Sequence, residues 1–250
     1  MSDTSAENQR LEKQPRQNSL SHKLREVQLN IERCARAAGR DAREIRLIAV
    51  SKTRSLQEVN ALADLGQQAF GENMVQDALT KIPYITQNVE WHFIGHLQSK
   101  KAGKIPGYFQ WIHSVDSIKL AKKLSSAMFA NNKNAELNCL IQVNVSAEQS
   151  KFGLMPGQVK PFLQEALQLD LACLKWRGLM TIGVQADEDQ TRNAFRELRL
   201  LQQECRDEFS LPEFDQLSMG MSGDYCLAIE QGATMVRVGT SIFGQREVAG

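Results

Sequence analysis

The stretch 46-RLIAVSKTRSLQEVNALADLGQQAFG-71 contains one full repeat of the pattern that decides the fold. Arg46–Ser51 is a short apolar run typical of a buried strand. Ser55–Leu65 spaces its apolar side chains as one face of a helix does, and Gly66 stops it. Gln68–Gly71 is the next short apolar run. A strand, a helix and a second strand in this order indicate a crossover unit of a parallel sheet.

The same alternation continues along the chain, with further helical candidates at Ser117–Ala130 and Asp187–Asp207. The candidate strands are Arg46–Ser51, Gln68–Gly71, Trp91–Gly95, Trp111–Val115, Asn138–Val145, Trp176–Ile182, Gln216–Met219 and Met235–Val238. Eight such units in about 230 residues predict a single (β/α)8 TIM barrel. A doubly wound open sheet is the alternative, but it usually has fewer strands, and no GxGxxG follows the first strand.

Two features of the N-terminal part lie outside the eight units. Residues 1–18 are mostly polar and predict a disordered tail. From Leu20 the apolar positions form one face of an extra N-terminal helix, which Gly39 can end. No linker rich in Pro, Gly or Ser divides the following residues. We therefore expect residues 19–250 to form one barrel domain.

The composition narrows the class of protein. The chain has 250 residues, and its 30 basic side chains nearly cancel its 29 acidic ones, which argues against binding nucleic acid or anionic membrane by bulk charge. No apolar run approaches the roughly 20 residues of a membrane helix. The five cysteines form no CxxC pair. We expect buried or free thiols and a cytoplasmic location.

Lys52 follows the first predicted strand, where a TIM barrel carries its working residues. A lysine at that position is either a rim residue or a functional amine. Desolvation at the mouth of an apolar barrel would lower its pKa and expose a nucleophile.

The loops after the seventh and eighth strands contain small and hydroxyl-bearing residues. Ser222 and Gly223 lie in one loop, and Gly239 and Thr240 lie in the other. Glycines let backbone N–H groups approach an anion, hydroxyls add donors, and a helix that begins near Ser222 would point its positive end at the same place. Both loops could instead be turns and caps. Their positions favour a phosphate site.

Arg237 lies two residues before Gly239, so strand alternation puts both on one face. A buried arginine needs a partner. That partner is either a carboxylate such as Glu72 or an acceptor on a bound ring. Pyridoxal phosphate has an aldehyde, a phosphate and a ring nitrogen, which would engage Lys52, the two loops and Arg237 together.

Two other candidates give weaker signals. Asn73 either contacts a bound ligand or caps the next helix. His92 and His96 are four residues apart, but the segment between them is typical of a strand end rather than the helix of a zinc site. We expect no metal site.

Six segments of this sequence together resemble the pyridoxal phosphate homeostasis protein family. They occur in order and at the spacing of barrel units, over roughly residues 20 to 246. The matching segments are Ile48–Thr53, Phe70–Gln76, Trp91–Gln98, Arg177–Met180, Leu217–Ser222 and Val236–Gly244.

The resemblance implies a barrel like the N-terminal domain of alanine racemases, with Lys52 as the Schiff-base lysine for pyridoxal 5'-phosphate. It also implies that Arg237 faces the pyridine nitrogen and that Asn73 lines the ring. The residues implied to hold the phosphate are Ser222, Gly223, Gly239 and Thr240. Some relatives resemble this pattern but carry an acidic residue at the position of Gly223, which bears on the local phosphate geometry only.

The family resemblance further implies that the protein binds and supplies the cofactor rather than turning over a substrate, with pyridoxal phosphate-dependent apoenzymes as candidate recipients. An arginine against the ring nitrogen weakens the cofactor as an electron sink. A racemase also needs a second acid–base group, and we expect no further domain to supply one. The alternatives are an amino-acid racemase and a Schiff-base aldolase. We expect a monomer.

Overall fold

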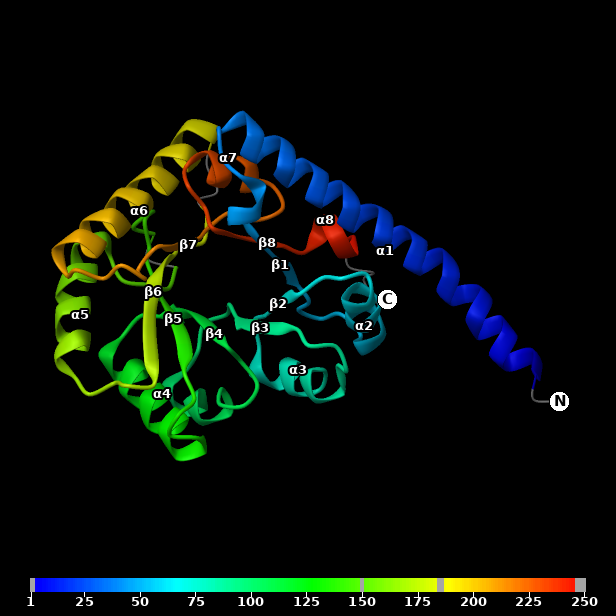
Figure 1. Cartoon of the computed structure of the whole chain (residues 1–250), viewed down its shortest axis with the longest axis horizontal. Coiled ribbons are helices and arrows are strands. Elements are labelled where there is room, and N and C mark those ends of the chain that lie inside the picture. The colour runs from blue at the N-terminus through cyan, green and yellow to red at the C-terminus, as the bar shows by residue number, and fades with distance from the viewer. Residues whose placement is uncertain (1–2, 149–150, 184–186, 246–250) are drawn as a thin grey trace.

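Eight parallel strands pair in chain order and close into a barrel in the computed structural model, which describes residues 3–148, 151–183 and 187–245 (Figure 1). The strands are β1 (Arg46–Val50), β2 (Ala69–Glu72), β3 (Glu90–Phe93), β4 (Trp111–Val115), β5 (Leu137–Gln142), β6 (Leu174–Met180), β7 (Gln216–Ser218) and β8 (Met235–Val238). The predicted TIM barrel is confirmed, because all eight candidate strands are present and the sheet has no open edge.

Helices follow the strands and cover the outside of the barrel (Figure 1). The α-helices are α1 (Asp3–Ala37), α2 (Leu56–Asp64), α3 (Val75–Leu79), α4 (Ile118–Asn131), α5 (Pro156–Gln168), α6 (Glu188–Glu208), α7 (Tyr225–Glu230) and α8 (Thr240–Phe243), and the 3-10 helices are η1 (Ala42–Glu44), η2 (Ile82–Tyr84) and η3 (Ser99–Lys104). The predicted helices after the first, fourth and sixth strands are confirmed as α2, α4 and α6.

The buried apolar side chains form two clusters. The larger one lies between the helices and the strands and includes Phe70, Phe93 and Phe195. The smaller one contains residues such as Ile48 and Met235, which neighbouring strands direct to the opposite face. The alternation of a strand explains this division, because successive side chains point to opposite faces of the sheet.

Helix α1 packs against α7 and α8 through the apolar face that the sequence predicts. Leu24, Val27 and Ile31 are buried, and Gly39, just past the helix end, has a φ of 67°. The Arg40 guanidinium donates to the carbonyls of Ile229 (2.9 Å) and Ala233 (2.8 Å), which ties the end of α1 to α7 and the turn after it.

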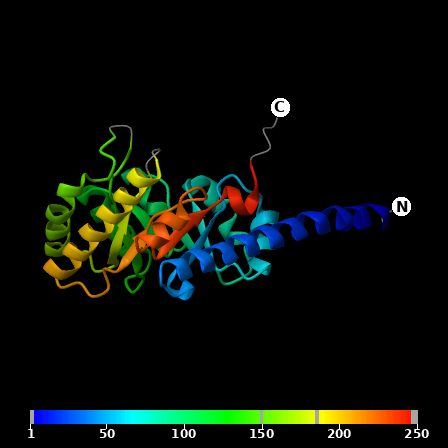
Figure 2. The ribbon, with the colours of Figure 1, turned by 90° about the horizontal axis from the view of Figure 1, so that it is seen from above.

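The structure differs from the sequence prediction at the N-terminal end of α1. Residues 3–18, predicted to be a disordered tail, continue the helix, and Figure 2 shows this end projecting beyond the barrel. Most of these residues are good helix formers such as Glu, Gln, Lys and Arg, so an existing helix can extend through them without a new nucleus. Residues 1–2 and 246–250 of the predicted tail and domain lie outside the described residues.

Cys34 on α1 and Cys226 on α7 form a disulfide. The prediction that all five cysteines are free thiols is therefore wrong for this pair. Cys139, Cys173 and Cys205 are free and buried, as expected. The two paired residues are 192 positions apart in the sequence, so only the packing of α1 on α7 reveals the pairing.

Within the described ranges, no helix is both long and apolar enough to cross a membrane.

We expect Cys34→Ser to lower the free energy of unfolding of the oxidised protein by about 2–4 kcal/mol, since the cross-link restricts a long loop of the unfolded chain. Urea denaturation without reductant measures this difference. With reductant, the variant and the parent protein should converge. Detecting five reactive thiols in the denatured, unreduced protein would contradict the pairing.

Candidate functional site

The predicted site residues come together at the carboxyl ends of the strands. β1 pairs with β8 in a register that joins Ala49 to Val238, and a Cβ added to Gly239 would lie 3.3 Å from Val50 Cβ. Lys52 is two residues beyond Val50, in the turn that follows β1. The closure of the barrel therefore brings this turn to the same end of the barrel as the loop that carries Gly239 and Thr240.

The loop after β7 joins the same end of the barrel. The Arg237 backbone N–H donates to the Gly220 carbonyl at 3.0 Å, which sets this loop beside β8. Ser222 and Gly223 follow in a turn, and Gly223 is exposed with open space where a Cβ would lie. Lys52, Arg237 and the two predicted phosphate loops thus occupy one end of the barrel.

The backbone on both sides of Lys52 is held by specific bonds. The Ser51 N–H donates to the Gly71 carbonyl (3.0 Å), and its hydroxyl donates to Glu72 Oε1 (2.6 Å). The Thr53 N–H donates to Asp77 Oδ2 at 3.0 Å. Thr53 has a φ of 61°, a left-handed conformation that costs energy in a β-branched residue. The loop therefore presents Lys52 from a fixed position.

The Lys52 side chain is exposed, contrary to the expectation that the barrel mouth removes it from water. Its neighbours explain why. Ser51 and Glu72 are fully buried against the outer layer, whereas the turn that follows lifts Lys52 above the end of β1. The amine is open to other molecules.

A second lysine beneath this loop was not predicted from the sequence. Lys81 is almost fully buried, and its Nζ lies 2.7 Å from Glu72 Oε1 and 3.0 Å from Asp77 Oδ2. It also donates to the Ser51 carbonyl at 2.9 Å. The four-residue spacing of Asp77 and Lys81 was the available signal, since such pairs interact along one side of a helix.

The two carboxyls around Lys81 have opposite pKa shifts. Burial raises the pKa of Glu72, although bonds from Lys81 and Ser51 oppose the rise. Burial would also raise the pKa of Asp77, but the Thr53 N–H and Lys81 together lower it. The Lys81 cation thus interacts with both carboxyl groups, and this cluster holds the Lys52 loop through the Ser51 carbonyl and the Thr53 N–H.

Arg237 is 4% exposed and faces the inside of the barrel. One guanidinium nitrogen donates to Ser218 Oγ at 2.7 Å and another to the Thr181 carbonyl at 2.7 Å. The alternative that Glu72 is its partner is wrong, because Glu72 binds Lys81 on the other face of β2. Burial lowers the pKa of Arg237 to about 10, against the attraction of Asp224, so the side chain stays charged at neutral pH.

The helices after the two phosphate loops are short. α7 begins at Tyr225 rather than near Ser222, because the N–H groups of Asp224 and Tyr225 both bond the Met221 carbonyl in a tight turn. α8 begins at Thr240, with Gly239 as its N-terminal cap. The first N–H groups of a helix have no partner within it, so those of α8 can bind an anion.

Asn73 lies beyond β2, next to the Lys52 loop. Its Oδ1 is buried and has no hydrogen-bond partner among the described residues. A Cβ at Gly95 would lie 2.1 Å from the Asn73 carbonyl, so glycine is required for this close approach of the ends of β2 and β3. An unpaired buried acceptor is rare enough in proteins to indicate a missing partner.

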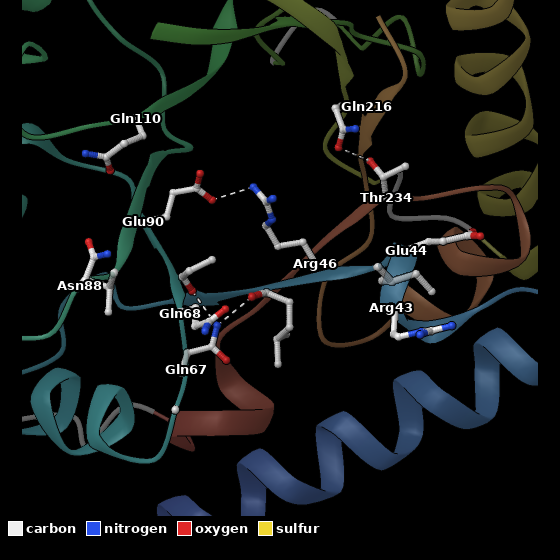
Figure 3. Close-up of a pocket in the computed structure, with 15 residues that line it drawn as sticks. Arg43, Glu44, Arg46, Gln67, Gln68, Asn88, Glu90, Gln110, Gln216 and Thr234 are labelled. Carbon is white, nitrogen blue, oxygen red and sulfur yellow. Dashed lines mark hydrogen bonds and ion pairs between the residues drawn. The ribbon is translucent and has the colours of Figure 1, made fainter. Parts of the chain in front are cut away.

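A cavity of about 860 Å³ opens at the other end of the barrel, away from these residues (Figure 3). Amide and charged side chains line it, including Gln67, Gln110 and Gln216. Arg46 and Glu90 form an ion pair of 2.6 Å across it. The amino ends of barrel strands usually serve stability rather than chemistry, so we do not assign the cofactor to this end.

Comparison with known proteins places residues 23–247 in a family described as "Alanine racemase, N-terminal domain". The chain is 38% identical over 232 residues to the pyridoxal phosphate homeostasis protein of Haemophilus influenzae, covering 91% of this chain and 96% of that protein. It is 41% identical over 231 residues to the protein of the same name from Pseudomonas aeruginosa, with 92% and 96% covered.

A solved structure of PipY from Synechococcus elongatus, described as having PLP bound, matches with a TM-score of 0.73 and 33% identity. The match covers 86% of this chain and 99% of PipY. The similarity therefore extends over nearly the whole of these relatives, and it agrees with the resemblance that the sequence motifs indicate.

We expect Lys81→Met to destabilise the protein by about 3–5 kcal/mol at neutral pH, because it leaves the buried Glu72 carboxylate without its cation. The Glu72→Gln/Lys81→Met double variant should regain part of this loss. Urea denaturation of the parent, both single variants and the double variant measures the coupling.

The loss in Lys81→Met should shrink as the pH falls. A carboxyl whose pKa is raised by folding favours the folded state at low pH and loses that contribution as the pH rises through its folded-state pKa. Equal losses in the single and double variants would contradict the pairing.

Proposed function

This chain belongs to the pyridoxal phosphate homeostasis protein family, and on that premise we propose that it binds pyridoxal 5'-phosphate as a Schiff base on Lys52. Its role is to hold the cofactor in intracellular vitamin B6 homeostasis, without catalysing turnover of a substrate.

The register of β1 against β8 carries this proposal. It sets a lysine, a buried guanidinium and two small-residue loops at one barrel end. These groups fit the cofactor's aldehyde, ring nitrogen and phosphate respectively. When bound, the cofactor supplies an electrophilic carbonyl and an electron-withdrawing ring.

Three observations indicate that these residues fit the cofactor. Arg237 is buried and charged and contacts no carboxylate of the described residues, so it keeps N–H groups that a ring acceptor can use. Asn73 Oδ1 is a buried acceptor without a partner in the described part of the chain. The exposed backbone at Gly223 leaves room for a phosphate beside Ser222. In this proposal the N–H groups at Gly239 and Thr240 complete the phosphate site.

The charge on Arg237 favours binding over catalysis. A protonated guanidinium beside the ring nitrogen disfavours a second positive charge on the ring, which reduces its capacity to withdraw electrons from a substrate. The relatives named as homeostasis proteins support the same reading. We therefore propose that the protein is not an enzyme.

The exposure of Lys52 suits delivery of the cofactor. An amine of another protein could reach the aldehyde-derived carbon from solvent and form a bond to it, while the bond from that carbon to Lys52 Nζ breaks and Lys52 becomes a free amine again. Pyridoxal phosphate-dependent apoenzymes are the partners that we propose. The monomeric state and the cytoplasmic location remain predictions. In a reducing compartment the Cys34–Cys226 pair would be kept as thiols.

We expect Lys52→Ala to abolish the Schiff-base absorbance of protein loaded with pyridoxal 5'-phosphate, because the variant lacks the amine that condenses with the aldehyde. Borohydride reduction and peptide mass spectrometry should locate the cofactor on Lys52 of the parent protein. Lys100→Ala, which removes another exposed amine, is the matched control and should keep the label.

A label on Lys81 instead of Lys52, or an unchanged absorbance in Lys52→Ala, would contradict the assignment.

The racemase alternative predicts a different result. We expect no α-deuteration of single-enantiomer amino acids by the loaded protein in deuterated water, measured by NMR against a cofactor-only control. Exchange at enzymatic rates that Lys52→Ala abolishes would overturn the non-enzymatic role.

A further inference from the structure

A continuous row of polar side chains crosses the inside of the barrel between its two ends. It starts at Glu90, on the wall of the cavity in Figure 3, and ends at Arg237. His92, His113 and Ser218 lie between them, each with no exposed surface. We name this row, Glu90–His92–His113–Ser218–Arg237, the polar column.

Each neighbouring pair in the polar column is joined by a hydrogen bond of ordinary length. His92 Nε2 lies 3.0 Å from Glu90 Oε2, and His92 Nδ1 lies 2.9 Å from His113 Nε2. His113 Nδ1 lies 2.8 Å from Ser218 Oγ, which is 2.7 Å from an Arg237 nitrogen. Strand β3 contributes two of these five side chains, and β4, β7 and β8 contribute one each, so the column spans the barrel.

The charge of Glu90, at one end of the polar column, fixes the direction of its hydrogen bond with His92. Burial would raise the pKa of Glu90, but the hydrogen bonds from His92 and Trp111 and the charge of Arg46 lower it, so Glu90 is an ionised acceptor. Arg46 donates to its Oε2 at 2.6 Å, and the Trp111 indole N–H donates to its Oε1 at 2.7 Å. His92 must therefore donate its Nε2–H to Glu90.

The direction of the Glu90–His92 bond determines the direction of the next two hydrogen bonds, through the two histidine rings. Burial lowers the pKa of His92 and lowers that of His113 further, which favours neutral rings with a single N–H each. His92 donates to Glu90, which leaves its Nδ1 as an acceptor for His113 Nε2–H. His113 Nδ1 is then an acceptor for the Ser218 hydroxyl.

The upper end is compatible with the same order. Arginine can only donate, so Ser218 Oγ accepts from Arg237. Its own proton can then go to His113 Nδ1, which the bonds below leave as an acceptor. The carboxylate at one end therefore sets the arrangement of protons, and the guanidinium at the other end fits it. Every bond of the column is satisfied in that arrangement.

We propose that the polar column positions Arg237 for the ring nitrogen of the cofactor by fixing the orientation of the Ser218 hydroxyl, which donates its proton to His113 Nδ1 and accepts from Arg237. Arg237 is then held at two nitrogens, by Ser218 and by the Thr181 carbonyl. These two bonds fix the orientation of its remaining N–H groups. His92, His113 and Ser218 are positioning residues, because they act through Arg237. This inference rests on the proposed function.

The composition of the barrel interior supports a positioning role. TIM barrels usually fill this space with branched apolar side chains. A buried polar group without a partner costs about 1–3 kcal/mol, so a row of polar groups is tolerated only when each link is made. A row in which every polar group is bonded fixes one orientation of the Arg237 guanidinium. Apolar packing alone would not fix that orientation.

The order of protons can be tested without the cofactor. In 15N NMR spectra of the cofactor-free protein, we expect both His92 and His113 to carry the proton on Nε2 and to have an unprotonated Nδ1. His92→Gln and His113→Gln assign the signals. A proton on Nδ1 of either ring would reverse the column and overturn the inference, whatever the cofactor does.

The effect on the cofactor is tested with Ser218→Ala and its matched control Ser114→Ala. Both remove a buried serine hydroxyl, but Ser114 Oγ has no hydrogen-bond partner among the described residues. We expect Ser218→Ala to shift the absorbance maximum of the Schiff base and to weaken cofactor binding about tenfold, the scale of a lost bond to a charged group. Ser114→Ala should match the parent protein.

The outcomes separate the two proposals. If the parent protein is labelled at Lys52 but Ser218→Ala has the parent's spectrum and affinity, the positioning role is overturned and the proposed function stands. If the parent protein is not labelled at Lys52, the proposed function fails, and the NMR experiment still decides the direction of the column.

Discussion

The hydrogen-bonded ladder between β1 and β8 closes the barrel and, through the same register, determines where the reactive groups lie. Pairing of Ala49 with Val238 sets Gly239 against Val50, so the turn that carries Lys52 and the loop after β8 lie at the same end of the barrel. A shift of one residue would turn the inward side chains of a strand outward. Arg237 would then lose its place inside the barrel. The fold and the proposed cofactor site therefore depend on one register.

A charged side chain is buried on each side of this sheet, Lys81 outside the barrel and Arg237 inside it, and the two have different kinds of hydrogen-bond partner. Outside the barrel, Lys81 shares its charge with Glu72 and Asp77 and holds the Lys52 loop. Inside, the partners of Arg237 in the described part of the chain are neutral, Ser218 and the Thr181 carbonyl, so the guanidinium remains available to a ligand. Burying a charge is costly unless it is bonded, which explains why the polar column is continuous. Lys52 is exposed, so its amine is accessible to solvent while the buried groups around its loop are held by hydrogen bonds.

Much of the fold was predictable because it repeats. Eight apolar runs at barrel spacing gave the strands, and alternation put Arg237 on the inner face. Features that depend on contacts between distant segments were not predictable: the Cys34–Cys226 pair and the bonds of His113 to His92 and Ser218 join residues from different strands or helices. The exposure of Lys52 also depends on a turn whose conformation, positive φ at Thr53, has no signature in the sequence. The helix at residues 3–18 follows from propensity rather than from an apolar pattern.

In the complex that we propose, Lys52 and Arg237 contact the same cofactor at opposite ends of its ring. A crystal structure of the protein soaked with pyridoxal 5'-phosphate would show both contacts at once. We predict a covalent bond from Lys52 Nζ to the aldehyde carbon, with the pyridine nitrogen within hydrogen-bond distance of the Arg237 guanidinium and the phosphate between the loops of Ser222 and Thr240. A cofactor bound in the cavity at the amino ends of the strands, or one whose aldehyde carbon lies beyond bonding reach of Lys52, would contradict the account.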